Sequence, residues 1–165
     1  MANLYSKEIN HIGVSVPDLD KALDWYQKIF GFEIIWKTET IRADDSSQLA
    51  LLFKDIFGPH FKKAKVAMLG SANNLGFEIF EFIDPKAERR TDNFEYWKSG
   101  FFHICITDPN IEELSEKICN NGGRRRSEFW KPVQDKERKL VYCEDPFGNI
   151  IEISTHSLEP TIGNQ

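Results

Sequence analysis

Residues 100–108 read GFFHICITD, and residues 9–18 read INHIGVSVPD. Each stretch places a histidine at the head of a run in which apolar residues occupy every second position. Successive side chains of a β-strand point to opposite faces, so alternation of this kind is typical of a strand that is buried on one face. The pattern predicts that Ile12, Val14, Ile104 and Ile106 face a core while His11 and His103 face away from it. The chain is therefore predicted to contain a duplicated strand that carries a histidine.

Each predicted strand leads into a helical pattern. Pro17 and Asp18 supply helix-start chemistry, and apolar residues then recur at helical spacing as far as Gly31. In the second half the apolar residues of 111–118 share one face, and a glycine pair follows at 122–123. Further strands are predicted over residues 32–40, 48–54, 65–69, 76–83, 101–107, 124–129, 139–143 and 150–155, with a loop at 55–64.

This order predicts a module at residues 8–83, a second module at 100–155 and a polar linker at 84–99. Together they form a single domain of residues 1–165.

Composition limits the classes of protein to consider. Of the 165 residues, 41% are hydrophobic and 28% are charged, which is typical of a soluble globular protein. The net charge of −5 gives no overall basic field for nucleic acid. The three cysteines are odd in number and form no CxxC pair, which favours a reducing compartment. No apolar run approaches the ~18 residues of a membrane span. We expect a cytoplasmic protein that has no nucleic-acid or membrane partner.

The last predicted strand of each module carries a glutamate between apolar neighbours, Glu78 in one and Glu152 in the other. If the first and last strands of each module lie close together, His11, Glu78, His103 and Glu152 can converge. Imidazole and carboxylate ligands suit Zn, Ni, Mn, Co or Fe. These four residues are the predicted metal ligands.

Simpler interpretations stand beside this one. A single histidine on a strand is more often a satisfied polar residue than a ligand, and the case here depends on the repetition. Glu81 is a rival to Glu78, but it lies three residues on and therefore on the opposite face of a strand. Phe80 shares the face of Glu78 and is a candidate for the wall of a substrate pocket, although aromatic residues are more often core.

With these pieces together, the chain resembles the vicinal oxygen chelate superfamily. That superfamily includes glyoxalase I, methylmalonyl-CoA epimerase, extradiol dioxygenases, and the fosfomycin and bleomycin resistance proteins. The resemblance covers residues 8–155 and is carried by the openings HIGVSVPDLDKALDWYQKIFGFE (11–33) and FHICITDPNIEEL (102–114) and by the closings FEIFEF (77–82) and DPFGNIIEI (145–153).

The resemblance implies an α+β fold of two paired βαβββ modules, whose mixed β-sheet forms a cup around a divalent metal ion. The two-histidine, two-glutamate ligand set of the family matches His11, Glu78, His103 and Glu152.

The function implied is that of a metal-dependent lyase or isomerase of glyoxalase type. Such an enzyme binds a small-molecule substrate through two adjacent oxygens and stabilises an enolate or enediolate. Either Glu78 or Glu152 can serve as the catalytic base, and the sequence does not choose between them. The alternatives are an Fe(II) extradiol-type dioxygenase, from which the fourth carboxylate is typically missing, and a non-catalytic antibiotic-binding protein, which lacks the ligand set. The resemblance also implies a homodimer.

Overall fold

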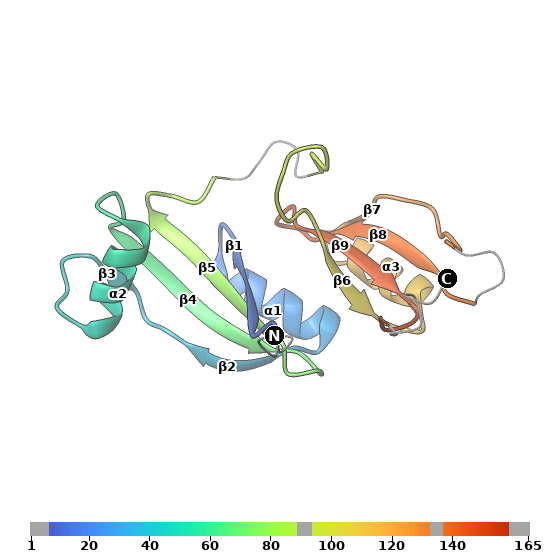
Figure 1. Ribbon diagram of the computed structural model, residues 1–165, viewed down its shortest axis with the longest axis horizontal. Helices are drawn as coiled ribbons and strands as arrows, with labels where there is room; N and C mark the ends of the chain where they lie inside the picture. The colour runs from blue at the N-terminus through green and yellow to red at the C-terminus, as the bar shows by residue number, and fades with distance from the viewer. Residues whose placement is uncertain (1–6, 89–93, 133–136, 159–165) are drawn as a thin grey trace, which may run out of the picture. The chain divides into compact units, whose positions relative to one another are not determined.

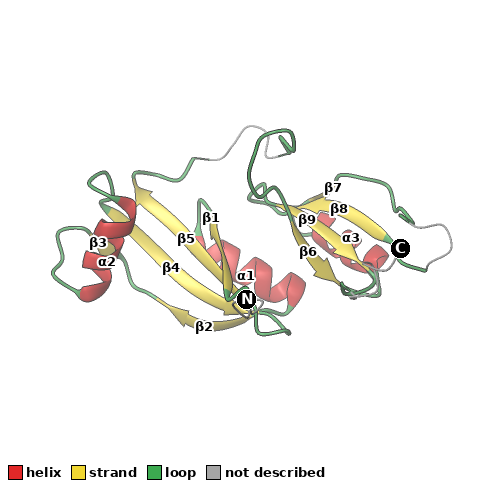
Figure 2. Ribbon diagram, in the orientation of Figure 1, coloured by secondary structure: helices red, strands yellow, loops and turns green. Residues whose placement is uncertain are grey.

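The same order of strands and helices occurs twice along the chain (Figures 1 and 2). A computed structural model describes residues 7–88, 94–132 and 137–158. Its contacts divide the chain into two compact units, Met1–Arg89 and Arg90–Gln165. Residues 89–93 of the predicted linker and the tail from residue 159 lie outside the described residues.

The first unit is a mixed sheet with helices. In chain order its elements are β1 (His11–Ser15), α1 (Leu19–Phe30), β2 (Glu33–Lys37), β3 (Ile41–Arg42), α2 (Gln48–Phe57), β4 (Lys63–Gly70) and β5 (Gly76–Asp84). The strand order is β1-β5-β4-β2, with β3 paired to β4. Strand β1 runs parallel to β5, and the other pairs are antiparallel. The first and last strands are therefore neighbours, as the convergence of ligands requires.

The second unit repeats this arrangement without helix α2 and with four strands instead of five. Its elements are β6 (Ile104–Thr107), α3 (Ile111–Cys119), β7 (Arg124–Arg125), β8 (Leu140–Glu144) and β9 (Ile150–Ser154). The strand order is β6-β9-β8-β7, and β6 runs parallel to β9. Two βαβββ-like mixed sheets confirm the predicted α+β class.

Helix α1 forms where its local chemistry predicts. The Asp18 side chain accepts a hydrogen bond from the Lys21 amide at 3.1 Å, and Gly31 ends the helix with a φ of 69°. The fully buried Tyr26 packs edge-on against Phe77 of β5, with ring centroids 4.9 Å apart. Because Phe77 and Glu78 are successive residues of a strand, α1 covers the face opposite Glu78.

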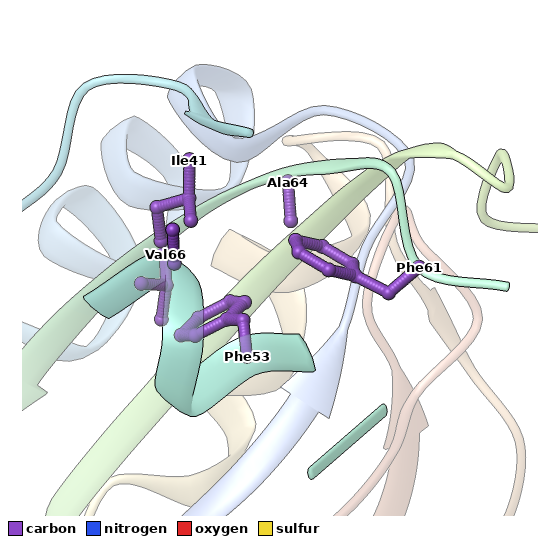
Figure 3. Packing of buried hydrophobic residues seen from close by; sticks show 6 residues of the cluster. Ile41, Phe53, Phe61, Ala64 and Val66 are labelled. Carbon is purple, nitrogen blue, oxygen red and sulfur yellow. The ribbon is translucent and has the colours of Figure 1, made fainter. Parts of the chain in front are cut away.

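Residues 48–54 correct a prediction, because they form helix α2 and not a strand. The run Leu49–Phe53 is short and wholly apolar, and periodicity cannot separate a buried helix from a strand in such a run. The Ser47 side chain accepts from the Ala50 amide at 3.2 Å and caps the helix. Ala50 and Phe53 are buried in a cluster that sits on the sheet (Figure 3).

Other predicted strands are shorter than expected. In the structure β6 begins at Ile104, just after His103, and β7 covers Arg124–Arg125 instead of residues 124–129. Helix α3 buries the predicted face, including Ile111 and Ile118. None of the described helices is long and apolar enough to cross a membrane.

Candidate metal centre

The first unit brings together two of the four predicted ligands. Parallel pairing of β1 with β5 sets His11 opposite Gly76 and Gly13 opposite Glu78. His11 Nε2 lies 3.5 Å from Glu78 Oε2, and the other ring nitrogen lies 2.8 Å from the Asn10 side-chain oxygen. Asn10 thus orients the imidazole so that Nε2 faces the glutamate.

Gly76 permits this close approach. A Cβ atom at Gly76 would lie 2.8 Å from the Cβ of His11 and 2.9 Å from the Sδ of Met68. Any side chain at this position would push the histidine away. The absence of a side chain at Gly76 therefore allows His11 to take its position beside Glu78.

The second unit brings together the other two predicted ligands. His103 Nε2 lies 3.3 Å from Glu152 Oε2. The same glutamate oxygen accepts a hydrogen bond from the Tyr142 hydroxyl at 2.7 Å. The four predicted ligands thus fall into two pairs, and we call each pair a half-site.

The residues that pair with the two glutamates in the sheets occupy equivalent positions in the two units. Glu78 pairs with Met68 on one side and Gly13 on the other, while Glu152 pairs with Tyr142 and Cys105. Tyr142 was not predicted from the sequence, although the position of the turn between residues 142 and 152 indicates that the two residues are paired. The hairpin turn covers residues 145–149 and has Phe147 at its centre. Residues 142 and 152 are each five residues from Phe147, so they lie opposite each other in the two strands.

Burial and the charge of Glu152 raise the pKa values of two of its neighbours. Burial raises the pKa of the Tyr142 phenol, and its hydrogen bond to Glu152 raises it further. The phenol therefore keeps its proton at neutral pH and acts as a donor. Desolvation of the Cys105 sulfur raises the pKa of that thiol to about 11, and the charge of Glu152 adds to this shift.

The half-sites have donor types that suit a divalent metal ion, an imidazole nitrogen and a carboxylate oxygen. A nitrogen–oxygen hydrogen bond measures about 2.7–3.2 Å, which is shorter than the separations of 3.3 and 3.5 Å. Two donors that bind one ion at about 2.1 Å lie about 3.0–3.4 Å apart at angles between square and tetrahedral. This range includes the 3.3 Å of the second half-site and ends just below the 3.5 Å of the first.

One ring nitrogen of His103 is buried and has no hydrogen-bond partner among the described residues. This atom is Nδ1, so no second bond from those residues fixes the tautomer of this ring. Within the described parts of the chain, no group of three or more His, Cys, Asp and Glu gathers in one place. Each unit supplies two donors.

Glu81 has a different position and a different role. Its Oε2 accepts from the Leu19 amide at the start of α1 at 3.0 Å and lies 3.5 Å from Lys65 Nζ. Glu81 therefore holds the helix on the opposite face of the sheet, while Glu78 is the glutamate that lies beside His11.

Phe80 lies on the face of Glu78, where it belongs to an aromatic cluster. Its ring stacks on Phe82 at 5.7 Å and meets Phe53 of α2 at 6.1 Å. A Cβ atom on Gly13 would lie 3.5 Å from the edge of this ring. Phe80 thus supports α2 beside the first half-site.

The chain is similar in sequence to several enzymes of known function. Lactoylglutathione lyase from Pseudomonas putida is 24% identical over 158 residues, covering 92% of this chain and 84% of that protein. The Schizosaccharomyces pombe enzyme of the same name is 28% identical and covers 91% of this chain, which spans 48% of its length. A 2-epi-5-epi-valiolone epimerase from Actinomyces is 24% identical and covers 88% of this chain and 77% of that protein.

Solved structures show the same fold at low sequence identity. A glyoxalase family protein from Bacillus cereus has a TM-score of 0.72 at 16% identity, covering 93% of this chain and 97% of that one. The fosfomycin resistance protein FosX of Listeria monocytogenes, complexed with Mn(II) and a dihydroxypropylphosphonic acid, has a TM-score of 0.59 at 18% identity, with coverage of 96% and 99%.

The family profile described as Glyoxalase/Bleomycin resistance protein/Dioxygenase superfamily matches residues 8–153. This chain belongs to that superfamily.

Proposed function

We propose that this protein is a divalent-metal-dependent lyase or isomerase of glyoxalase type. The observation that carries the proposal is the pair of half-sites, each of which sets one imidazole Nε2 within 3.5 Å of one glutamate oxygen. Relatives named as lyases and an epimerase support the reaction class, and the Mn(II) in FosX supports the kind of cofactor.

We expect the metal ligands to be His11 and Glu78 in the first unit and His103 and Glu152 in the second. Zn, Ni, Mn, Co and Fe all accept such a donor set. When bound, the ion supplies a Lewis acid that stabilises negative charge on two adjacent substrate oxygens.

The residues of the chain supply the rest of the chemistry. A glutamate takes the proton from the carbon beside a carbonyl and returns it to the neighbouring carbon, so the substrate is isomerised with no net change in protons. The histidines keep Nε2 directed at the glutamates, and Asn10 fixes this orientation for His11. Partial burial of both glutamates, with 21% and 17% of their side chains exposed, limits competition from water.

Metal content tests the proposal. Elemental analysis of protein purified without chelator or metal-affinity resin is expected to find about one ion per chain. The ion is expected to be lost in His103→Ala and kept in Glu81→Gln, which preserves the acceptor for the Leu19 amide. If the ion is present, lactoylglutathione and 2-epi-5-epi-valiolone are the first substrates to assay. Bound iron with no isomerase activity would favour a dioxygenase, and failure to take up any metal would refute the proposal.

A further inference from the structure

The two half-sites differ at repeat-equivalent positions. In the first unit the neighbours of Glu78 across the sheet are Met68 and Gly13, neither of which has a side-chain hydrogen-bond donor of ordinary strength. In the second unit the corresponding neighbours of Glu152 are Tyr142 and Cys105. The repeat therefore preserves the ligands and changes what surrounds them.

This difference leaves the two glutamates unequally restrained. Glu152 Oε2 accepts from the Tyr142 hydroxyl at 2.7 Å and lies 3.3 Å from His103 Nε2. Glu78 has His11 at 3.5 Å, and no hydroxyl donor lies beside it in the described part of the first unit. A phenol hydrogen bond to a carboxylate at this distance is charge-assisted and about twice as strong as a neutral one.

Tyr142 is itself held in place, so it can restrain another residue. Its backbone amide donates to the Ser127 hydroxyl at 2.9 Å. Its ring packs between Phe94 and His103, with centroid distances of 6.0 and 5.4 Å. Packing and the backbone bond together fix the direction of the phenol oxygen.

We propose that Tyr142 is a positioning residue that anchors the Glu152 carboxylate beside His103 in the second unit. This inference rests on the proposed function and deepens it.

Metal-free protein tests the anchoring by itself. High-resolution crystal structures are compared for wild type, Tyr142→Phe and Met68→Leu, which is the matched change at the equivalent position of the first unit. We expect one conformer of Glu152 in wild type and Met68→Leu, and several conformers in Tyr142→Phe. An unchanged Glu152 conformer in Tyr142→Phe would overturn the inference, whether or not the protein binds metal.

Metal binding tests the consequence, with Zn(II) and Mn(II) alone as probes in calorimetric titrations. Loss of a residue that orients a ligand lowers metal affinity by about 10–100-fold, and we expect this for Tyr142→Phe but not for Met68→Leu. Thermal unfolding of each variant checks that it is folded.

A double-mutant cycle then locates the effect. The losses from Tyr142→Phe and Glu152→Gln should be non-additive, because both remove the same bond, while those from Tyr142→Phe and Glu78→Gln should add. Additive losses in the first pair would refute the anchoring of Glu152. If wild type takes up no metal, the proposed function fails and the crystal structures alone decide the role of Tyr142.

Discussion

Gly76→Ala is expected to displace His11 and weaken metal binding. The new Cβ would stand 2.8 Å from the Cβ of His11, and this distance must lengthen to at least 3.4 Å to become an ordinary contact. Metal–ligand distances tolerate deviations of only about 0.2 Å. A shift of this size at the root of the imidazole therefore exceeds the tolerance of the site. We expect the metal affinity to fall about 10-fold or more, the size of effect seen when ligand support is disturbed.

The same substitution should lower stability. Overpacking a tight contact costs about 1–3 kcal/mol, while replacing glycine reduces the entropy of the unfolded chain and returns about 0.4–1 kcal/mol. These two terms give a net loss between about 0 and 2.6 kcal/mol in the free energy of unfolding, with a midpoint of about 1.3 kcal/mol. Urea denaturation followed by circular dichroism measures it, and titration with Mn(II) measures the affinity.

Gly13→Ala is the matched control on the neighbouring strand. A Cβ atom there would meet Phe80 at 3.5 Å, which is an ordinary contact, although Gly13 lies directly beside Glu78 in the sheet. We expect its stability to change by less than about 1 kcal/mol and its metal affinity to stay near that of wild type. Wild-type stability and affinity in Gly76→Ala would refute the argument that close approach of β1 and β5 places the histidine.

Two further predictions concern the second unit. Glu144 is only 4% exposed and accepts hydrogen bonds from Arg124 and Arg126, so Glu144→Gln removes the carboxylate charge that both arginines contact. Allowing for solvent around Arg124, we expect a loss of about 1–3 kcal/mol in urea denaturation, and no loss would mean that water replaces the carboxylate. Burial raises the pKa of Cys143 to about 11, so at pH 8 only about one thiol in a thousand is the reactive thiolate. The rate at which a disulfide reagent labels Cys143 should increase as the pH rises toward 11 or when the protein unfolds. The exposed Cys119 serves as the internal reference. Equal labelling rates of the two cysteines at pH 8 would contradict the burial argument.

Local chemistry explains which parts of the fold were predictable from sequence. Helix α1 was found because a capping side chain and a closing glycine, Asp18 and Gly31, mark its ends within a few residues. Helix α2 was missed because its two buried residues lie within a short apolar run. What decides between helix and strand there is packing against distant residues, Phe61 and Val66, which the local sequence does not contain.

The predicted ligands lie in pairs because alternation and pairing act together. Period-two alternation fixes the face of a side chain, and the parallel pairing of β1 with β5 and of β6 with β9 then brings each histidine beside a glutamate. Tyr142 was missed because its importance depends on register across a hairpin and not on its own neighbours. The ligand assignment itself remains a prediction that metal analysis will test.

The differences between the half-sites also bear on how such a chain can change by mutation. In an assembly of two identical single-module chains, one codon change would alter both halves at once, so a tyrosine beside one glutamate would appear beside the other as well. Fusion of two modules in a single reading frame removes this constraint. Two pairs of equivalent positions in the two sheets hold different residues, Met68 and Tyr142 in one pair and Gly13 and Cys105 in the other. Each half of this gene can therefore be selected for a separate task.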